Sequence, residues 1–274
     1  MLERLKKKPR SDLSFARPTQ GCELIRFEDL YKSFGKKKVF EGLSLSICEG
    51  ETLTVMGGSG TGKSVLLKCL IGLMYPEQGK VIFEGQNVAE FTESEFLPVR
   101  QRIAMVFQGS ALFDSLSVGE NIAYPLREHF PKITEDEIKE RVAAKLEMVN
   151  LPGIEDMKPA DLSGGMRKRV GLARAIAVEP EVILWDEPTT GLDPVSTRMI
   201  DKLIISMREK LGCTSIVVTH DMDSAFEVSD RIAMLAKRKI VQVGSVEEMQ
   251  SSTVPEVRAF FDARTPSRAG GSAR

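Results

Sequence analysis

The chain alternates short apolar runs with longer amphipathic segments, a pattern typical of α/β proteins. The short runs predict β-strands at 24–27, 43–47, 52–56, 81–83, 103–107, 182–185, 215–219, 231–235 and 240–243. The runs at 182–185 and 215–219 are almost continuously apolar, as in parallel strands covered on both faces. The last two strands enclose a basic turn of Lys237, Arg238 and Lys239, which predicts a hairpin.

Helical periodicity dominates the middle of the chain. Thr134 and Glu137 have the spacing of a capping box, which predicts the start of a helix. The apolar residues that follow at helical spacing lie on one face: Ile138, Val142, Leu146 and Val149. We therefore predict a folded body at about 23–248 with a helical section at about 110–175. Residues 1–22 predict a flexible basic tail, and residues 249–274 a C-terminal extension that is partly flexible.

Composition narrows the class of protein. A chain of 274 residues with 42% hydrophobic residues can bury a full core. Its 38 basic and 39 acidic residues leave a net charge of -1, so no global field favours nucleic acid. Cys22, Cys48, Cys69 and Cys213 show no metal-ligand spacing, and a reducing cytoplasm fits them. No apolar stretch has the length needed to cross a bilayer, so we expect membrane contact only through a partner.

The strongest motif is the sequence GGSGTGKS, which follows the strand at 52–56 and precedes a helical segment. Its members are Gly57, Gly58, Ser59, Gly60, Thr61, Gly62, Lys63 and Ser64. This spacing is that of a P-loop, whose backbone N–H groups and helix start cradle phosphate. We expect Lys63 to reach the β- and γ-phosphates of ATP, and the Ser64 hydroxyl to bind Mg²⁺.

Two further segments suit the same chemistry. Asp186 and Glu187 end a buried strand, so both carboxylates emerge at the edge of the sheet where α/β ligands bind. Asp186 is the expected partner of Mg²⁺, and Glu187 the base that polarises the attacking water. Upstream, the sequence LSGGM places Ser163, Gly164 and Gly165 at the start of a helix, again an anion-binding geometry.

These motifs in this order resemble the ATPases of the ABC transporter family over residues 24–248. The resemblance implies a P-loop NTPase core of the RecA-like type, an antiparallel β subdomain and an inserted helical subdomain. Three more residues match its motifs by position: Gln108 in the Q-loop as nucleotide sensor and Mg²⁺ ligand, Asp193 in the D-loop, and His220 as the switch histidine on the γ-phosphate. The segment LSGGM resembles the signature motif of the family, in which glutamine usually stands where this chain has Met166. We expect this departure to affect helix packing and not ATP binding.

The family places an aromatic residue against adenine. Phe34 occupies that place where tyrosine is more usual, and Tyr31 is the alternative. The family also implies a head-to-tail dimer, with ATP held between Gly57–Ser64 of one copy and Ser163–Gly165 of the other. A tail segment with Phe260 and Phe261 either helps to hold such a dimer or docks as a terminal helix.

Within the family, the sequence LSGGMRKRVGLARAIAV is similar to the ATPases of Mla-type phospholipid transporters. That similarity implies permease subunits, a lipid-binding substrate protein in the same complex, no nucleic acid, and a position at the cytoplasmic face of the inner membrane. The alternatives are an ATPase for amino acids, metals or drugs, a soluble ABC protein acting on DNA or ribosomes, and a non-hydrolysing scaffold. The single P-loop and the intact Glu187 and His220 argue against the last two.

Overall fold

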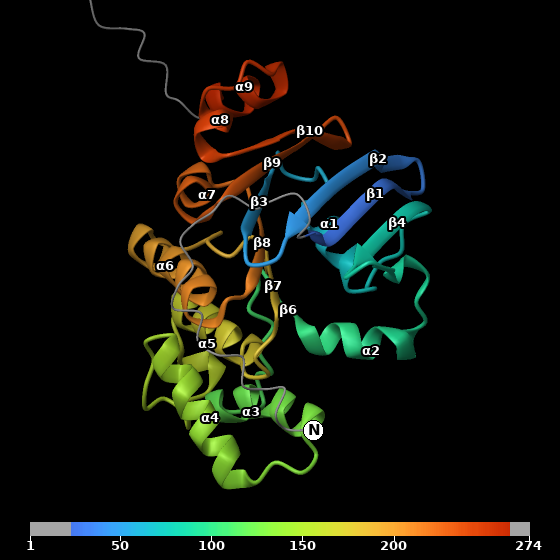
Figure 1. Ribbon diagram of the computed structural model, residues 1–274. Coiled ribbons are helices and arrows are strands. Elements are labelled where there is room, and N and C mark those ends of the chain that lie inside the picture. The colour runs from blue at the N-terminus through green and yellow to red at the C-terminus, as the bar shows by residue number, and fades with distance from the viewer. Residues whose placement is uncertain (1–22, 264–274) are drawn as a thin grey trace, which may run out of the picture.

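A computed structural model describes residues 23–263 of the chain. The predicted basic tail at 1–22, which includes Cys22, lies outside the described residues, as does the segment 264–274. The described chain forms two sheets and a helical region (Figure 1). No helix among residues 23–263 is long and apolar enough to cross a bilayer.

The larger sheet has six strands in the order β10-β9-β3-β8-β7-β6. Its strands are β3 (Thr52–Met56), β6 (Ile103–Val106), β7 (Val182–Asp186), β8 (Thr214–Thr219), β9 (Arg231–Ala236) and β10 (Lys239–Gly244). All pairs are parallel except β9 with β10, which form the predicted hairpin. Every residue of β3, β7 and β8 is buried, which explains their lack of polar alternation.

The smaller sheet is antiparallel, with the order β2-β1-β4-β5. It contains β1 (Glu23–Phe34), β2 (Lys37–Cys48), β4 (Gln78–Phe83) and β5 (Gln86–Asn87). The first two strands are 12 residues each, much longer than the runs at 24–27 and 43–47 that predicted them. Their outer halves carry exposed and charged residues, and register shifts interrupt the pairing. Polar alternation with bulges gives no apolar run, so the sequence underestimates such strands.

Helix α1 (Lys63–Leu70) joins the two sheets into one core. Its Leu66, Leu67 and Leu70 are fully buried in a cluster that includes residues of both sheets. Helix α2 (Glu93–Arg102) adds Phe96 and Val99 to the same cluster. The position of α1 is therefore determined by packing on both sides, which fixes the loop that precedes it.

The helical region gathers at one end of the molecule (Figure 1), and its apolar residues form one core with those of α6 (Pro194–Leu211) and of one face of the larger sheet. It is built from α3 (Val118–His129), α4 (Glu135–Met148) and α5 (Gly164–Ala175). The predicted capping box of α4 is confirmed, because Thr134 and Glu137 each accept a hydrogen bond from the other's backbone. The predicted apolar face of α4 is also buried in this core.

Four helices of the C-terminal part pack on the larger sheet: α6, α7 (Met222–Val228), α8 (Val246–Gln250) and α9 (Pro255–Asp262). Helix α6 lies near β7 and β8, and α7, α8 and α9 lie near β3 and β9. Val257 and Phe261 are buried, and the Phe261 ring meets Phe226 edge to face at 5.6 Å. The boundary predicted at 248 falls inside α8. The helical chain continues to Asp262, within the extension predicted at 249–274, because α9 packs on the core.

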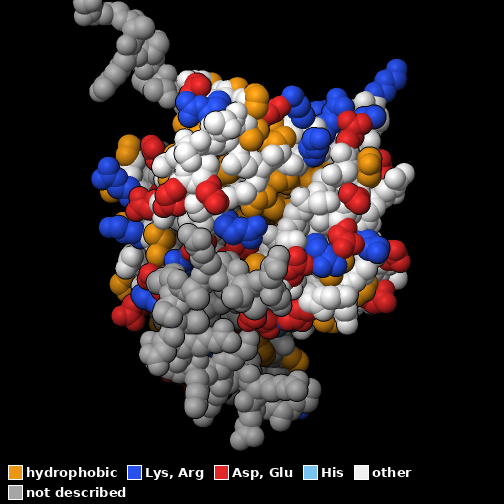
Figure 2. Space-filling view, turned by 45° about the horizontal axis from the view of Figure 1, so that its top comes forward, with side chains coloured by type: hydrophobic (Ala, Val, Ile, Leu, Met, Phe, Trp, Pro, Cys, Tyr) orange, Lys and Arg blue, Asp and Glu red, His pale blue; other side chains and the backbone are white. Residues whose placement is uncertain are grey.

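Figure 2 shows one face of the molecule, which has a hollow near its centre. Hydrophobic side chains gather in the central hollow, and charged side chains of both signs surround it. The charges are interspersed, in keeping with 38 basic and 39 acidic residues over the whole sequence.

Candidate functional site

The site lies where three neighbouring parallel strands end. Strand β8 lies between β3 and β7, with Met56 opposite Thr219 and Asp186 opposite Val218. The P-loop follows β3, the Asp186–Glu187 pair ends β7, and His220 follows β8. Parallel strands bring their carboxyl ends to one edge, so these segments meet in space although they are far apart in the sequence.

The P-loop has a shape that requires glycine. Gly62, the N-cap of α1, has φ +107°, a conformation that L side chains rarely adopt. A Cβ there would lie 2.4 Å from Val39 and 2.9 Å from Phe40. Gly57 is equally constrained, because a Cβ would lie 2.5 Å from the carbonyl oxygen of Leu235. Thr61 closes the loop by donating to the carbonyl of Gly58 at 2.9 Å.

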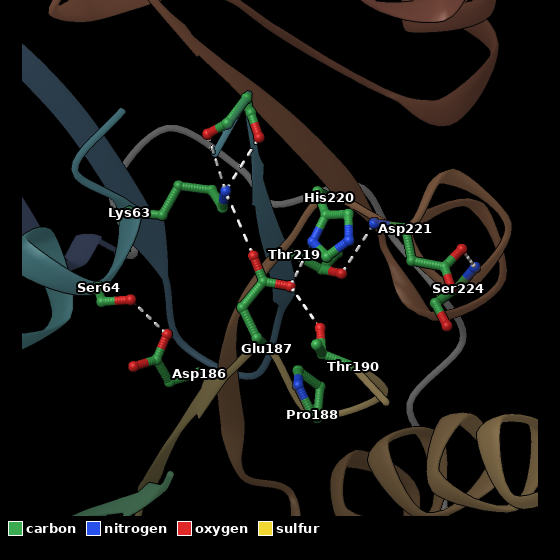
Figure 3. A network of polar contacts seen from close by, with 12 residues as sticks. Lys63, Ser64, Asp186, Glu187, Pro188, Thr190, Thr219, His220, Asp221 and Ser224 are labelled. Carbon is green, nitrogen blue, oxygen red and sulfur yellow. Dashed lines mark hydrogen bonds and ion pairs between the residues drawn. The ribbon is translucent and has the colours of Figure 1, made fainter. Parts of the chain in front are cut away.

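Lys63 lies inside this loop with 6% of its side chain exposed. Its ammonium donates to the carbonyls of Gly57 at 2.9 Å and Gly58 at 3.2 Å. It also forms an ion pair with Glu187 Oε1 at 3.3 Å (Figure 3). The loop thus holds a positive charge in the wall of the site, beside the start of α1.

Two oxygen donors meet next to Lys63. Ser64 Oγ donates to Asp186 Oδ1 at 2.6 Å, and Asp186 is buried at the end of β7 (Figure 3). A hydroxyl and a carboxylate that converge in this way form a donor set that suits Mg²⁺, a hard cation that binds oxygen. Gln108 is exposed after β6 and lines one cavity together with Lys63 and Ser64, where its side chain offers an amide oxygen. The residues present therefore fit the ion.

Glu187 is the centre of the polar network (Figure 3). Its Oε2 accepts from His220 Nδ1 at 2.7 Å and from Thr190 Oγ1 at 3.0 Å. Its backbone has φ +50°, in the left-handed region, and its N–H donates to Val218 at 2.9 Å. A carboxylate held by two donors and one ammonium has a fixed position, as a catalytic base requires.

A cavity of about 700 Å³ opens over this network. Of the predicted residues, it is lined by Phe34, Gly58, Ser59, Gly60, Gly62, Lys63, Ser64, Gln108, Glu187 and His220. Phe34 is 47% exposed, so its ring is accessible for stacking. Tyr31 is not among the lining residues, and its hydroxyl lies near Gly42 instead.

Four of the predicted residues lie apart from this cavity: Ser163, Gly164, Gly165 and Asp193. Ser163 is the N-cap of α5 and accepts from Met166 N at 3.2 Å. Asp193 caps α6 and accepts from Val195 N and Ser196 N. The two helix starts lie together, because a Cβ on Gly165 would be 2.9 Å from Ser196 Oγ. Ser163, Gly164 and Asp193 are exposed, so the predicted ATP ligands form two separate groups within one chain.

Sequence reasoning missed several residues of the site. Thr190 donates to Glu187, and Lys168 donates to the carbonyls of Pro188 and Thr190. Phe260 of α9 lines the cavity from the C-terminal extension. The position of Thr190, three residues after Glu187, is the one local signal that could have been used. The other two contacts join segments whose proximity depends on the tertiary fold.

Comparisons with known proteins agree with this geometry. The sequence profile of the family described as "ABC transporter" matches residues 40–190. The chain is 39% identical over 241 residues to the intermembrane phospholipid transport system ATP-binding protein MlaF of Escherichia coli K12, covering 88% of this chain and 89% of that protein. It is 42% identical over 240 residues to the probable ribonucleotide transport ATP-binding protein mkl of Mycobacterium leprae, covering 88% and 69%.

Solved structures show the same fold. The dimeric ATP-binding cassette MJ0796 bound to ADP and phosphate aligns with a TM-score of 0.75 at 30% identity, covering 81% of this chain and 98% of that one. The protein cbiO1 of Clostridium perfringens, part of an ABC transporter complex, aligns with a TM-score of 0.77 at 29% identity, covering 89% and 96%. With its P-loop, carboxylate pair and signature helix in the arrangement described, the chain belongs to the ATP-binding ATPase subunits of the ABC transporter family.

Proposed function

We propose that two copies of this chain hold Mg-ATP between them and couple its hydrolysis to transport by membrane permease subunits. The observation that carries the proposal is the separation of the ATP ligands. Lys63, Glu187 and His220 form one connected network, whereas Ser163 and Gly164 lie exposed outside the cavity. A second copy, placed head to tail, would bring its Ser163–Gly165 helix start to the open side of the first copy's cavity. The dimeric state of the MJ0796 cassette supports this arrangement.

The residues of the cavity divide the chemistry among them. Lys63 and the N–H groups of the P-loop would hold the phosphates of ATP, and Phe34 the adenine. Ser64, Asp186 and Gln108 would hold Mg²⁺, which supplies charge neutralisation on the phosphates. The carboxylate of Glu187 would accept a proton from the attacking water, and its three partners keep it in place. His220, next to Glu187, would contact the γ-phosphate, and Asp193 would reach the partner copy.

These proposed roles fit a division of the chain into an ATPase domain and a C-terminal extension. Residues 23–248 would form the ATPase domain, with the helical subdomain at about 110–175 carrying the signature start of α5. Residues 249–274 would form a C-terminal extension, of which α9 packs on the core. Within the complex, the subunit would lie at the cytoplasmic face of the inner membrane, attached through the permease.

We propose a phospholipid as the transported substrate, handled by a lipid-binding protein in the same complex. The similarity to MlaF over 88% of the chain supports this choice. The similar identity to the mkl proteins, whose name states ribonucleotide transport, makes ribonucleotides the second candidate. To decide, the subunit should be purified in detergent with the membrane proteins it retains, and its ATPase rate measured at fixed ATP concentration with added phospholipid or with added pyrimidine ribonucleotides. Stimulation by ribonucleotides alone would contradict the phospholipid proposal.

The Glu187→Gln variant tests the proposed role of the base. The amide keeps the shape of the side chain but cannot accept the proton, so ATP hydrolysis should fall about 100-fold to 10,000-fold. ATP binding should persist, and the variant should remain dimeric with Mg-ATP by light scattering. Glu209→Gln, an exposed change on α6, is the matched control and should hydrolyse ATP at the parent rate. Hydrolysis by Glu187→Gln at the parent rate would remove the role assigned to Glu187.

A further inference from the structure

Lys168 is a buried lysine on the signature helix. It lies in the second turn of α5, and only 8% of the residue is exposed. Its ammonium donates to the carbonyl oxygens of Pro188 and Thr190, each at 2.7 Å. No carboxylate within residues 23–263 forms an ion pair with it at 4.0 Å or less. Burial lowers the pKa of Lys168, and the charge of Glu187 acts against that shift.

The two carbonyls belong to the turn that directly follows Glu187. Glu187 itself has a left-handed backbone, and Thr190 N donates back to the Glu187 carbonyl at 3.3 Å. The side chain of Thr190 also donates to the Glu187 carboxylate. The ammonium therefore holds both ends of a short turn whose conformation sets where the carboxylate of Glu187 lies. A charged donor on one buried and one partly buried carbonyl is a strong and directional contact.

The same lysine is attached to the start of α5. Lys168 is four residues after Gly164, so about 6 Å of rigid helix separates it from the exposed end that carries Ser163. Val170 and Leu172 are fully buried in the helical core and keep the helix in one piece. A displacement of the Ser163 end is thus passed directly to the Lys168 ammonium and to the turn after Glu187.

We propose that Lys168 is a positioning residue that couples the two ATP sites of the dimer. Through Lys168, the ATP that the partner copy presents to Ser163–Gly165 sets the position of Glu187, which acts on the ATP of its own chain. This inference rests on the proposed functions of Ser163 and Glu187. It adds to them a physical link within one chain between the ligand of one site and the base of the other.

The link is tested with Lys168→Met and Lys168→Arg in the full complex with its permease. Methionine keeps the length and fills the space but donates no hydrogen bond, so kcat should fall about tenfold or more while the ATP affinity changes less than twofold. The Hill coefficient for ATP should fall towards one, because the sites no longer communicate. Arginine retains charged donors and should restore most of kcat and of the Hill coefficient.

A purely structural role is separated by two controls. Lys145→Met removes another buried lysine of the helical region, whose ammonium pairs with Glu179 at 3.1 Å, and should leave kcat and the Hill coefficient unchanged. In a double-mutant cycle, Lys168→Met should add no further loss to Glu187→Gln, since Lys168 acts through that carboxylate. Additive losses, or a Lys168→Met protein with the parent kcat and Hill coefficient, would overturn the inference.

The same experiments separate this inference from the proposed function. If Glu187→Gln and Ser163→Arg both abolish hydrolysis while Lys168→Met does not change it, the coupling role alone is wrong. If Glu187→Gln or Ser163→Arg hydrolyses ATP like the parent protein, the proposed function fails first.

Discussion

The P-loop and the start of α5 are both glycine-containing helix starts, but the chain treats them differently. The P-loop is embedded, with Lys63 and Gly57 buried and an added Cβ on Gly62 meeting Val39 and Phe40. At the start of α5, Ser163 and Gly164 are exposed, and an added Cβ on Gly164 would meet nothing within 4 Å. Within one chain, the P-loop is therefore enclosed by packing, whereas the start of α5 is left open to the surface.

This difference indicates which contacts to ATP a single copy could make and which would need a second copy. Lys63 is held beside the P-loop by two carbonyls and by Glu187, so its charge already lies in the wall of the cavity. A phosphate would replace one of these three partners of the ammonium. The exposed helix start has its N–H dipoles aligned, and in the proposed dimer it would contact ATP bound to a second copy. Closing that dimer would then be the step that adds the second surface.

Mixing two inactive variants tests whether the P-loop of one copy and the α5 start of another form one site. Lys63→Ala removes the embedded charge and Ser163→Arg blocks the open surface, so each variant alone should lose about 1,000-fold in ATPase rate. A mixed dimer keeps one intact P-loop facing one intact Ser163. With random assortment half of the dimers are mixed and each has one intact site, so equal amounts should restore at most about a quarter of the parent rate. The coupling proposed for Lys168 would lower this value, because the second site of the mixed dimer holds no ATP, but the rate should still lie well above that of either variant alone.

The steady-state ATPase rate of the mixture, after exchange of subunits, measures this complementation. Mixing Lys63→Ala with Glu187→Gln is the matched control and should restore nothing, because both changes affect the same side of the site and leave each P-loop half defective. Recovery in the control, or none in the first mixture, would contradict a site shared by two copies.

Two variants test which aromatic side chain near the P-loop stacks on adenine. Phe34 lines the cavity whereas Tyr31 does not, so Phe34→Ala should raise KM for ATP about tenfold by removing a stacking surface. Tyr31→Ala should leave KM within twofold of the parent value. ATPase rates measured over a range of ATP concentrations give both values. A raised KM for Tyr31→Ala alone would transfer the adenine contact to that ring.

A buried carboxylate outside both proposed ATP-facing surfaces should have a smaller effect, which is on the stability of the fold. Asp201 of α6 is buried and accepts from Ser224 Oγ at 2.8 Å. Burial, followed by the charges of Glu227 and Asp221, raises its pKa from 3.8 to about 6. The folded protein therefore binds more protons than the unfolded chain between these values, and this contribution to stability is lost as pH rises through 6.

Asp201→Asn keeps an acceptor for Ser224 and removes the buried charge. It should stabilise the fold at pH 7.5 by roughly 2 kcal/mol, seen as a rise of about 5 °C in Tm, and have no effect below pH 4. Thermal unfolding at several pH values is the measurement, with Glu209→Gln as the control. An equal change in Tm at pH 4 and pH 7.5 would show that the charge of Asp201 is not the cause.

Sequence reasoning found the elements whose signals are local. Strand β3 was predicted with its exact limits, because five consecutive buried residues lie between turn residues. The capping box of α4 depends on residues three positions apart, and it is present as predicted. The strands β1 and β2 were predicted too short, since half of each lies on a solvated sheet where polar residues hide the pattern.

In the site, too, features encoded by adjacent residues were predicted, whereas contacts between distant segments were not. The spacing of glycines, Lys63 and Ser64 identifies a phosphate-binding loop, because the backbone geometry of that loop is set by adjacent residues. The sequence also placed Asp186, Glu187 and His220 at the ends of strands. It could not show that β8 lies between β3 and β7, which brings the Ser64 hydroxyl within 2.6 Å of Asp186 and His220 within 2.7 Å of Glu187.

Residue types at short, fixed spacings were enough to identify the family, the phosphate-binding loop and the acidic and basic groups. Which of these groups touch is seen only in the folded chain, as are the position of Phe34 rather than Tyr31 at the cavity and the hydrogen bonds from Lys168 to the turn after Glu187. These contacts join segments far apart in the chain, and their distance is set by the packing of sheets and helices.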